Sequence, residues 1–300
     1  MFLTNHEGYF IDISTAQLSA LLAIADLGTF DAAARHLHVT PSAVSQRIRA
    51  LESAVGQVLV QRSSPCVPTP AGERLVGVAR QTQLLLSELS DTAADDLPTA
   101  LPVAVNADSL ATWFRPVLDE LGTWDGVALR LFVEDQAYSG DLLRRGEALA
   151  AVTSDPRPVQ GCRVERLGTM RYLPAASPAF AERWRGSRGM DWVGMPVVVF
   201  NEKDDIQHSV LRRHRVERPP VVHRVPTSAD FHESVRGGLG WAAIPEPQLL
   251  PDVDAGRLVV LSRRDHVDVE LMWQRWRLDS PLLSRLTDAV QAAAASGLRR

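Results

Sequence analysis

The chain has 300 residues, 45% of them hydrophobic and 23% charged, which is the composition of a globular protein of about two domains. No apolar run approaches the ~18–20 residues that cross a bilayer, and residues 1–11 carry no secretory signal pattern. Only Cys66 and Cys162 are present, far apart, so we expect free thiols, no metal site and a cytoplasmic protein. The net charge of −4 does not favour nucleic-acid binding, although a local basic surface would be sufficient for it.

The first predicted helix begins after Ser14, which forms a capping-box pattern with Gln17, and ends at Gly28. Its apolar residues recur at the spacing of a buried helical stripe: Leu18, Leu21, Leu22 and Ala25. A second, short helix is predicted over Phe30–Leu37, and three consecutive alanines within it allow a neighbouring helix to approach closely.

The third predicted helix begins with Thr40 as N-cap and Pro41 as first helical residue. One face is apolar, and the opposite face carries Ser42, Ser45, Gln46 and Arg49. Gln pairs with adenine, Arg with guanine and Ser with either, so this face is suited to reading base edges. The short connection from Leu37 to Pro41 is typical of a helix-turn-helix. The same polar stripe would also fit an ordinary solvated helix face.

The segments that follow favour the DNA-binding interpretation. A strand over Val58–Val60 and a Ser- and Pro-rich loop over Arg62–Pro68 predict a wing, with Arg62 reaching a phosphate. A long helix over 70–92 then carries a coiled-coil seam, and 91–99 resembles a linker. A single helix cannot bury such a seam on a small winged domain, so we expect a dimer that presents two recognition helices. The seam consists of Leu75, Ala79, Thr82, Leu86 and Leu89.

The run from Phe30-Asp31-Ala32-Ala33-Ala34 through His38 to Ile48, followed by Leu51-Glu52, resembles the DNA-binding signature of LysR-type regulators. The resemblance implies a winged helix-turn-helix over 12–69, a linker and dimerisation helix over 70–92, and double-stranded promoter DNA as partner. It also implies a homodimer or homotetramer and contact with RNA polymerase. The implied DNA contacts are Thr40, Pro41, Ser42, Ser45, Gln46, Arg47, Arg49 and Arg62.

From residue 101 onward strand and helix patterns alternate, which predicts a mainly parallel α/β sheet. The strands are expected at 101–105, 127–133, 148–152, 197–200, 221–225, 241–244 and 258–261. The helices are expected near 109–121, 141–145, 178–184, 205–213 and 229–236. No nucleophile elbow or Walker loop is present, and Gly237–Gly240 fits a helix end better than a dinucleotide site. We therefore expect no enzymatic activity and no cofactor.

Ligands in such sheets bind beyond the carboxyl ends of the strands, near helix N-termini. The hydroxyls at Ser109, Thr227 and Ser228 would suit an α-carboxylate, and acids beside them would suit a guanidinium or ammonium group. This combination favours a basic amino acid, although each residue alone would also fit an ordinary cap or loop. The candidate effector residues are Asn106, Asp108, Ser109, Glu134, Asp135, Asn201, Asp204, Asp205, Thr227 and Ser228.

The family resemblance implies two lobes similar to periplasmic binding proteins: lobe I over 100–166 and 268–300, and lobe II over 167–267, with crossovers near Arg166 and Val267. The segment Ala104–Trp113, with Val133-Glu134-Asp135 and Trp273, looks like the branch of lysine/arginine-responsive regulators of basic amino-acid export. That branch implies activation of an exporter gene.

Two features depart from the family pattern, the extension over 1–11 and the proline-rich wing over Ser63–Pro68. Two alternatives stay open. One is a LysR-type regulator of a different metabolite. The other is a solute-binding protein, against which the missing signal and the first ninety residues argue.

Overall fold

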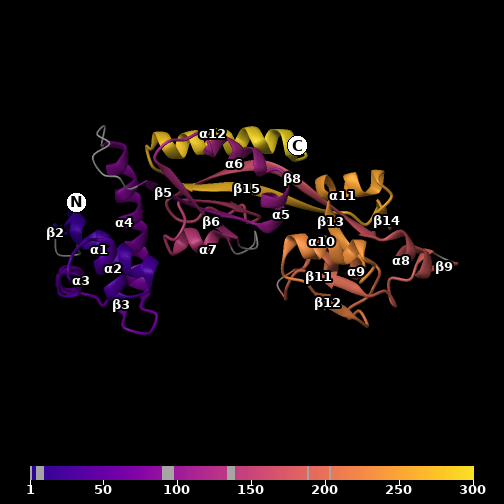
Figure 1. The fold of residues 1–300 in the computed structure, drawn as a ribbon, viewed down its shortest axis with the longest axis horizontal. Coiled ribbons are helices and arrows are strands. Elements are labelled where there is room, and N and C mark those ends of the chain that lie inside the picture. Colours follow the sequence, from indigo (N-terminus) through magenta and orange to yellow (C-terminus); the bar gives the residue numbers. More distant parts are fainter. Residues whose placement is uncertain (1, 5–9, 90–97, 134–138, 188, 203) are drawn as a thin grey trace.

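The computed structural model describes residues 2–4, 10–89, 98–133, 139–187, 189–202 and 204–300. A mainly helical N-terminal unit, a central α/β lobe and a second α/β lobe follow one another along the long axis of the molecule (Figure 1). None of the helices in these ranges is both long enough and apolar enough to cross a membrane.

The N-terminal unit folds around a core that α1, α2, α3 and α4 share. The predicted capping box is present: Ser14 Oγ accepts from Gln17 N at 3.3 Å, and Gln17 Oε1 accepts from Ser14 N at 2.8 Å. Leu21 and Ile24 of α1 and Ile48 of α3 lie in this core. The elements are β1 (Phe2–Thr4), β2 (Phe10–Asp12), α1 (Thr15–Leu27), α2 (Phe30–His36), α3 (Pro41–Val55), β3 (Val60–Gln61), β4 (Val67–Pro68) and α4 (Pro70–Leu89).

Helix α4 is the last element of the N-terminal unit and packs against both α1 and the central lobe, so two of its sides have a neighbour within the chain (Figure 1). Leu75 and Ala79, the first residues of the predicted seam, are buried in the same core as α1, and Leu84 is buried in the central lobe. We expected that a single chain could not bury the coiled-coil seam of α4. This expectation is wrong for the first half of the seam, Leu75 and Ala79. Leu86, in the second half of α4, is 44% exposed.

The central sheet joins both lobes and has seven strands in the order β13-β8-β15-β7-β5-β6, with β14 also paired to β8. We expected a mainly parallel sheet. Among the described residues of this sheet, however, only β5 pairs in parallel, with β6 and β7, and the pairs that β8 and β15 form are antiparallel. The strands are β5 (Thr99–Val105), β6 (Val127–Val133), β7 (Ala150–Thr153), β8 (Cys162–Ala176), β13 (Ala242–Pro245), β14 (Val259–Val260) and β15 (Val267–Trp276).

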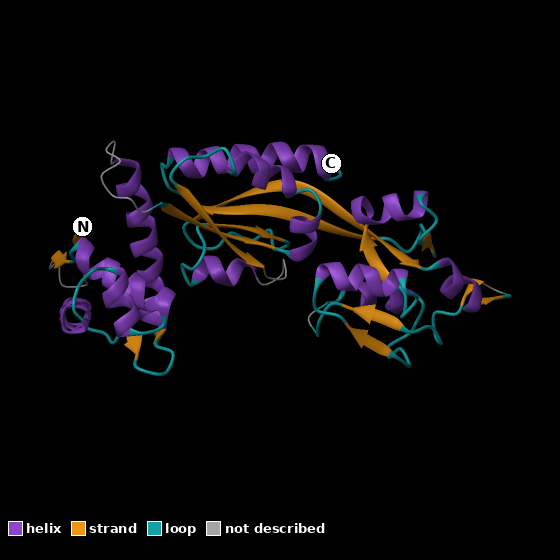
Figure 2. Ribbon diagram, in the orientation of Figure 1, coloured by secondary structure: helices purple, strands orange, loops and turns teal. Residues whose placement is uncertain are grey.

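The long strands β8 and β15 run from the central lobe into the second one, and they are the reason for the mixed sheet (Figure 2). The sequence pattern predicts neither strand, because charged side chains such as Arg163 and Glu165 interrupt the apolar pattern of β8. The predicted crossover positions Arg166 and Val267 both lie on these strands.

Helices cover both faces of the sheet in the central lobe, with α6 and α12 on one face and α7 on the other (Figure 2). The helix predicted over 109–121 is two helices, because Thr112 leaves the helical conformation and its Oγ1 donates to Asp108 O at 2.6 Å. Trp273 is fully buried here, and its Nε1 donates to Thr287 Oγ1 at 3.1 Å. The helices are α5 (Ala107–Ala111), α6 (Arg115–Leu121), α7 (Ser139–Arg144) and α12 (Pro281–Gly297).

The second lobe is stabilised by a buried carboxylate. Asp252 of α11 accepts hydrogen bonds from His232 and Arg236 of α10 and from Arg257. Burial alone would raise the pKa of Asp252, but these donors hold that pKa well below its usual range. The remaining elements are α8 (Pro178–Arg183), β9 (Arg185–Gly186), β10 (Gly189–Met190), β11 (Val197–Val199), α9 (Ile206–Arg213), β12 (Val222–Arg224), α10 (Ser228–Arg236) and α11 (Glu246–Asp254).

Candidate functional site

The exposed face of α3 carries the predicted base-reading residues. Val44, Ile48 and Leu51 are buried, which turns the opposite stripe toward solvent. Thr40 is the N-cap, and its Oγ1 accepts from Ala43 N at 3.2 Å. The predicted residues Thr40, Pro41, Ser42, Gln46 and Arg49 are exposed, whereas Ser45 and Arg47 are half-buried.

The wing is the short hairpin of β3 and β4, which pair antiparallel. Arg62 follows β3 and is exposed, and its guanidinium lies 5.2 Å from the centre of the Phe30 ring. This cation–π contact tethers the arginine to α2, the first helix of the helix-turn-helix. The N-terminal unit therefore presents a helix face with amide, hydroxyl and guanidinium groups next to a wing that carries Arg62.

A cavity of about 420 Å³ lies between the two lobes. It is bounded by the start of α5, the end of β6, strand β8, the segment from β11 into α9, the start of α10 and strand β13 together with Gln248 of α11. The lining residues are Asn106, Ala107, Asp108, Val133, Tyr172, Phe200, Asn201, Glu202, Asp204, Ile206, Gln207, Ser228, Phe231, Ala243, Pro245 and Gln248.

The cavity is acidic. Asp108 accepts from Tyr172 Oη at 2.8 Å, so a buried tyrosine of β8 orients this carboxylate. Asp204 accepts from Phe200 N at 2.9 Å and from Ile206 N at 3.2 Å, so backbone groups on both sides of it hold this carboxylate. Glu202 also lines the cavity, and none of its described lining residues is basic. Such a lining attracts a cation.

Two buried polar atoms beside the cavity have no hydrogen-bond partner. They are Oδ1 of Asn106 and Oγ of Ser109, in residues that are 2% and 0% exposed. An unsatisfied buried polar atom costs about 1–3 kcal/mol, so a ligand or water that supplied a donor here would be stabilised. Asn106 is also one of the residues that line the cavity.

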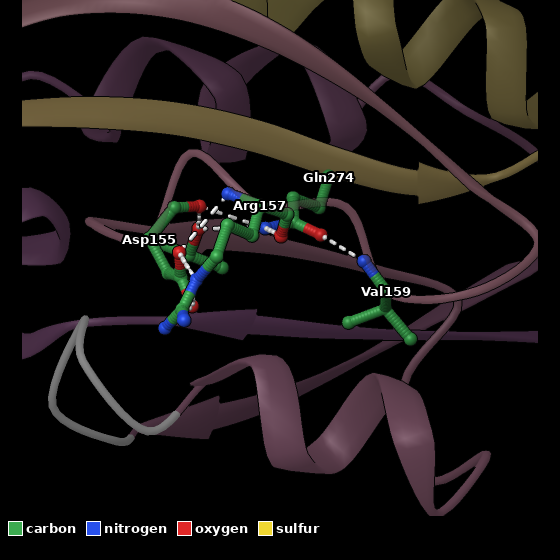
Figure 3. A network of polar contacts seen from close by, with 5 residues as sticks. Asp155, Arg157, Val159 and Gln274 are labelled. Atoms are coloured by element: carbon green, nitrogen blue, oxygen red, sulfur yellow. Dashed lines mark hydrogen bonds and ion pairs between the residues drawn. The ribbon is translucent and has the colours of Figure 1, made fainter.

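A buried amide, that of Gln274, fixes the loop that follows β7 (Figure 3). From β15, Gln274 Nε2 donates to Thr153 Oγ1 at 3.2 Å and to the carbonyl oxygens of Asp155 and Arg157 at 2.9 and 3.1 Å. Its Oε1 accepts from Val159 N at 3.0 Å. Because β5, β6 and β7 are parallel, this loop leaves the sheet at the same edge at which Asn106 and Val133 line the cavity.

The structure brings five predicted effector residues to the cavity: Asn106, Asp108, Asn201, Asp204 and Ser228. Others lie elsewhere. Asp205 does not line the cavity, because its carboxylate pairs with Arg212 at 2.8 Å, which also lowers the pKa of Asp205. Thr227 is the N-cap of α10, and Ser109 is buried behind the lining. Glu134 and Asp135 are outside the residues that the structure describes.

Sequence reasoning missed several lining residues. Tyr172 lies on the unpredicted strand β8, so no local pattern placed it near Asp108. Phe200 and Glu202 flank the predicted Asn201 and could have been included from position alone. Gln207 and Phe231 lie in the first turns of α9 and α10. Helical periodicity could have shown that these first turns lie next to the ends of the strands that precede them, where the cavity is.

The comparisons with known proteins agree with this architecture. Residues 15–73 match the bacterial regulatory helix-turn-helix protein model of the lysR family, and residues 96–295 match the LysR substrate binding domain. The lysine export transcriptional regulatory protein LysG of Corynebacterium efficiens is 49% identical over 94% of this chain and 98% of its own length.

Two solved structures are similar over nearly the whole chain. Full-length LysG from Corynebacterium glutamicum with bound effector Arg is 44% identical, with a TM-score of 0.77, and the match covers 96% of this chain and all of that one. ArgP from Mycobacterium tuberculosis is 46% identical, with a TM-score of 0.85, over 96% of this chain and 99% of that one.

A helix-turn-helix with an exposed polar recognition face, joined by a long helix to a two-lobed α/β domain with a ligand-sized cleft, defines a ligand-responsive DNA-binding regulator. The chain belongs to the LysR family of transcription regulators. This family consists of regulators and not of enzymes, as the sequence predicted.

Proposed function

We propose that this chain senses a basic amino acid, lysine or arginine, and controls transcription of an amino-acid exporter gene. The acidic cavity between the lobes carries the proposal, because its described lining holds Asp108, Glu202 and Asp204 and no basic residue. The names of the similar proteins, LysG and ArgP, support the same ligand class.

The chemistry of the cavity supports a specific orientation of the ligand. The carboxylates of Asp108 and Asp204 stabilise cationic groups by charge-assisted hydrogen bonds, and the free Oδ1 of Asn106 accepts from an ammonium or guanidinium group. In this orientation Ser228 at the start of α10 donates to the α-carboxylate, because the dipole of the helix favours a negative charge there. Phe200 and Phe231 cover the aliphatic part of the side chain.

The proposed partners follow from this role. The regulator binds double-stranded promoter DNA in the cytoplasm through α3 and the wing, and it contacts RNA polymerase when it activates. It acts as a homodimer or homotetramer that uses the second half of α4, where Leu86 is exposed, and the effector domain.

Calorimetric titration of the full-length protein tests the ligand class. We expect L-arginine and L-lysine to bind, and L-citrulline, which has the length of arginine but a neutral head, to bind more weakly. Asp108→Asn keeps the size of the side chain and removes its charge. We expect it to weaken arginine binding by about 10–100-fold, because hydrogen bonds to charged groups contribute about 1.5–3 kcal/mol.

Asp205→Asn is the matched control, because it neutralises a nearby acid that does not line the cavity. We expect this variant to bind arginine as the unaltered protein does. Equal binding of arginine and citrulline, or full binding by Asp108→Asn, would contradict the proposal. A regulator of a different metabolite would bind none of these amino acids while still binding promoter DNA.

A further inference from the structure

A charged contact joins the N-terminal unit to the central lobe. Arg80 of α4 donates from Nη2 to Asp26 Oδ1 at 2.9 Å and from Nη1 to Oδ2 at 3.3 Å, and Asp26 lies near the end of α1. The same carboxylate accepts from Arg130 Nη1 of β6 at 3.1 Å. The side chain of Arg80 is only 7% exposed, and arginine is rarely so buried unless it is paired. We call Asp26, Arg80 and Arg130 the docking cluster.

The backbone of the central lobe completes this contact. Arg80 Nε donates to the Gly146 carbonyl oxygen at 2.8 Å. Gly146 has φ +67°, and a Cβ built there would lie 2.2 Å from Cα of Gly77 in α4. No larger residue fits at position 146 unless α4 moves away from the lobe. The two units are thus packed backbone against backbone, and the guanidinium of Arg80 pairs with both.

The docking cluster is connected to the cavity through the strands that carry it. Arg130 lies on β6, and the same strand ends at Val133, which lines the cavity. The loop after Gly146 is fixed to the neighbouring strand, because Leu149 N donates to Pro102 O of β5 at 2.9 Å, and β5 leads into Asn106 of the cavity wall.

The docking cluster is also connected to the recognition helix. Asp26 is on α1, and α1 shares one core with α3 through Leu21 and Ile48. An acid in the last turn of a helix opposes the dipole of that helix, so Asp26 contributes nothing favourable to α1 by itself. Its favourable interactions are those with the two arginines, of which one is on the linker helix and one in the central lobe.

We propose that Asp26, Arg80 and Arg130 are positioning residues that couple occupancy of the cavity to the orientation of α3. The cluster holds the winged unit against the central lobe, so a shift of β5 and β6 on ligand binding moves α1 and the recognition helix with it. This inference rests on the proposed function, because it needs an effector in the cavity.

The test compares DNA affinity with and without saturating L-arginine, measured by fluorescence anisotropy on a promoter fragment at fixed salt. In the unaltered protein the ratio of the two affinities gives the coupling, which is typically about 5–150-fold. We expect Asp26→Asn and Arg130→Gln each to bring this ratio to about one. Binding of arginine in calorimetry and binding of DNA without effector should stay near the values of the unaltered protein.

Three further variants separate coupling from loss of structure. Asp26→Glu retains the charge and should restore part of the ratio. The double variant Asp26→Asn/Arg130→Gln should reduce the ratio of DNA affinities no further than either single variant does, because both residues act through one contact. Arg185→Gln removes an exposed ion pair in the second lobe and should leave the ratio unchanged. Arg130 is 46% exposed, so its replacement leaves both cores intact even where a variant at the buried Arg80 does not fold.

The outcomes distinguish the two proposals. Variants of the docking cluster that bind arginine and respond with the ratio of the unaltered protein would overturn the positioning role. An unaltered protein that binds neither arginine nor lysine would instead contradict the proposed function.

Discussion

The two working surfaces of this protein are assembled in different ways. The DNA-binding face comes from one helix and an adjoining hairpin, and the helices that support it follow one another directly in the sequence. The effector cavity is lined by segments between Asn106 and Gln248, drawn from strands and helices of two lobes. The first surface depends on local helix formation and a small core, whereas the second depends on long strands that hold distant segments together.

The largest expected effect is in the long-range region, at Asp252. Asp252→Asn leaves Arg236 and Arg257 without their buried carboxylate, and we expect it to destabilise the second lobe by on the order of 3 kcal/mol. Hydrogen exchange should show this loss in α10 and α11 and not in α1–α3. Equal loss of protection in α1–α3 and in α10–α11 would contradict the claim that the N-terminal unit and the second lobe are stabilised independently.

Acid should also destabilise the second lobe of the unaltered protein. The pKa of Asp252 is lower in the folded than in the unfolded chain, so its stabilisation is fully present above about pH 4 and is lost as the pH falls toward the folded pKa. The second lobe of Asp252→Asn should lack this contribution to acid sensitivity. Asp205→Asn, at an exposed ion pair, is the control and should change the stability of the lobe little.

The next effect concerns the local region. Arg49→Ala should cost about 1–3 kcal/mol of discrimination and relax specificity at one base position, because the polar face of α3 is predicted to read base edges through this guanidinium. Arg62→Ala should weaken binding to all sequences alike. It should also reduce the slope of the logarithm of the binding constant against the logarithm of the salt concentration by about one. Affinities measured on operator and scrambled DNA at several salt concentrations separate the two. A uniform loss for Arg49→Ala would assign that arginine to the phosphate backbone.

A smaller effect is expected at Tyr172, whose hydroxyl orients Asp108 across the sheet. Tyr172→Phe should weaken arginine binding by about fivefold, which corresponds to one hydrogen bond of about 1 kcal/mol. DNA binding without effector should not change. Unaltered arginine affinity in calorimetry would show that the orientation of Asp108 does not limit binding.

The smallest effect is a difference in reactivity between the two cysteines. Burial raises the pKa of Cys162 to about 12, so its thiol is protonated and enclosed in the folded protein. Cys66 is half-buried within the loop of the wing. Iodoacetamide at about pH 8 should modify Cys66 first, and Cys162 only after unfolding, as mass spectrometry would show. Early modification of Cys162 would mean that the central lobe opens readily.

The same contrast explains how much could be predicted from the sequence. Capping residues and helical periodicity located α1, α2 and α3, because each depends on neighbours three or four positions away. The strands β8 and β15 could not be predicted in this way, since their charged faces hide the alternation and their partners lie about a hundred residues away.

Within the cavity, residues at strand ends such as Asn106 and Asn201 could be placed by a general rule for α/β sheets, whereas Tyr172 and Gln248 could not. Asp205 shows the limit of that rule. It lies next to Asp204 in the sequence, but it pairs with Arg212 outside the cavity, and only the path of the backbone distinguishes the two acids.

The most direct test of the account measures the affinity of the full-length protein for its promoter DNA with and without saturating L-arginine. We expect the two affinities to differ by about 5–150-fold, and arginine to bind the DNA complex more tightly or more weakly by the same factor. Identical DNA affinities, with arginine bound as shown by calorimetry, would contradict the claim that the cavity controls the recognition helix.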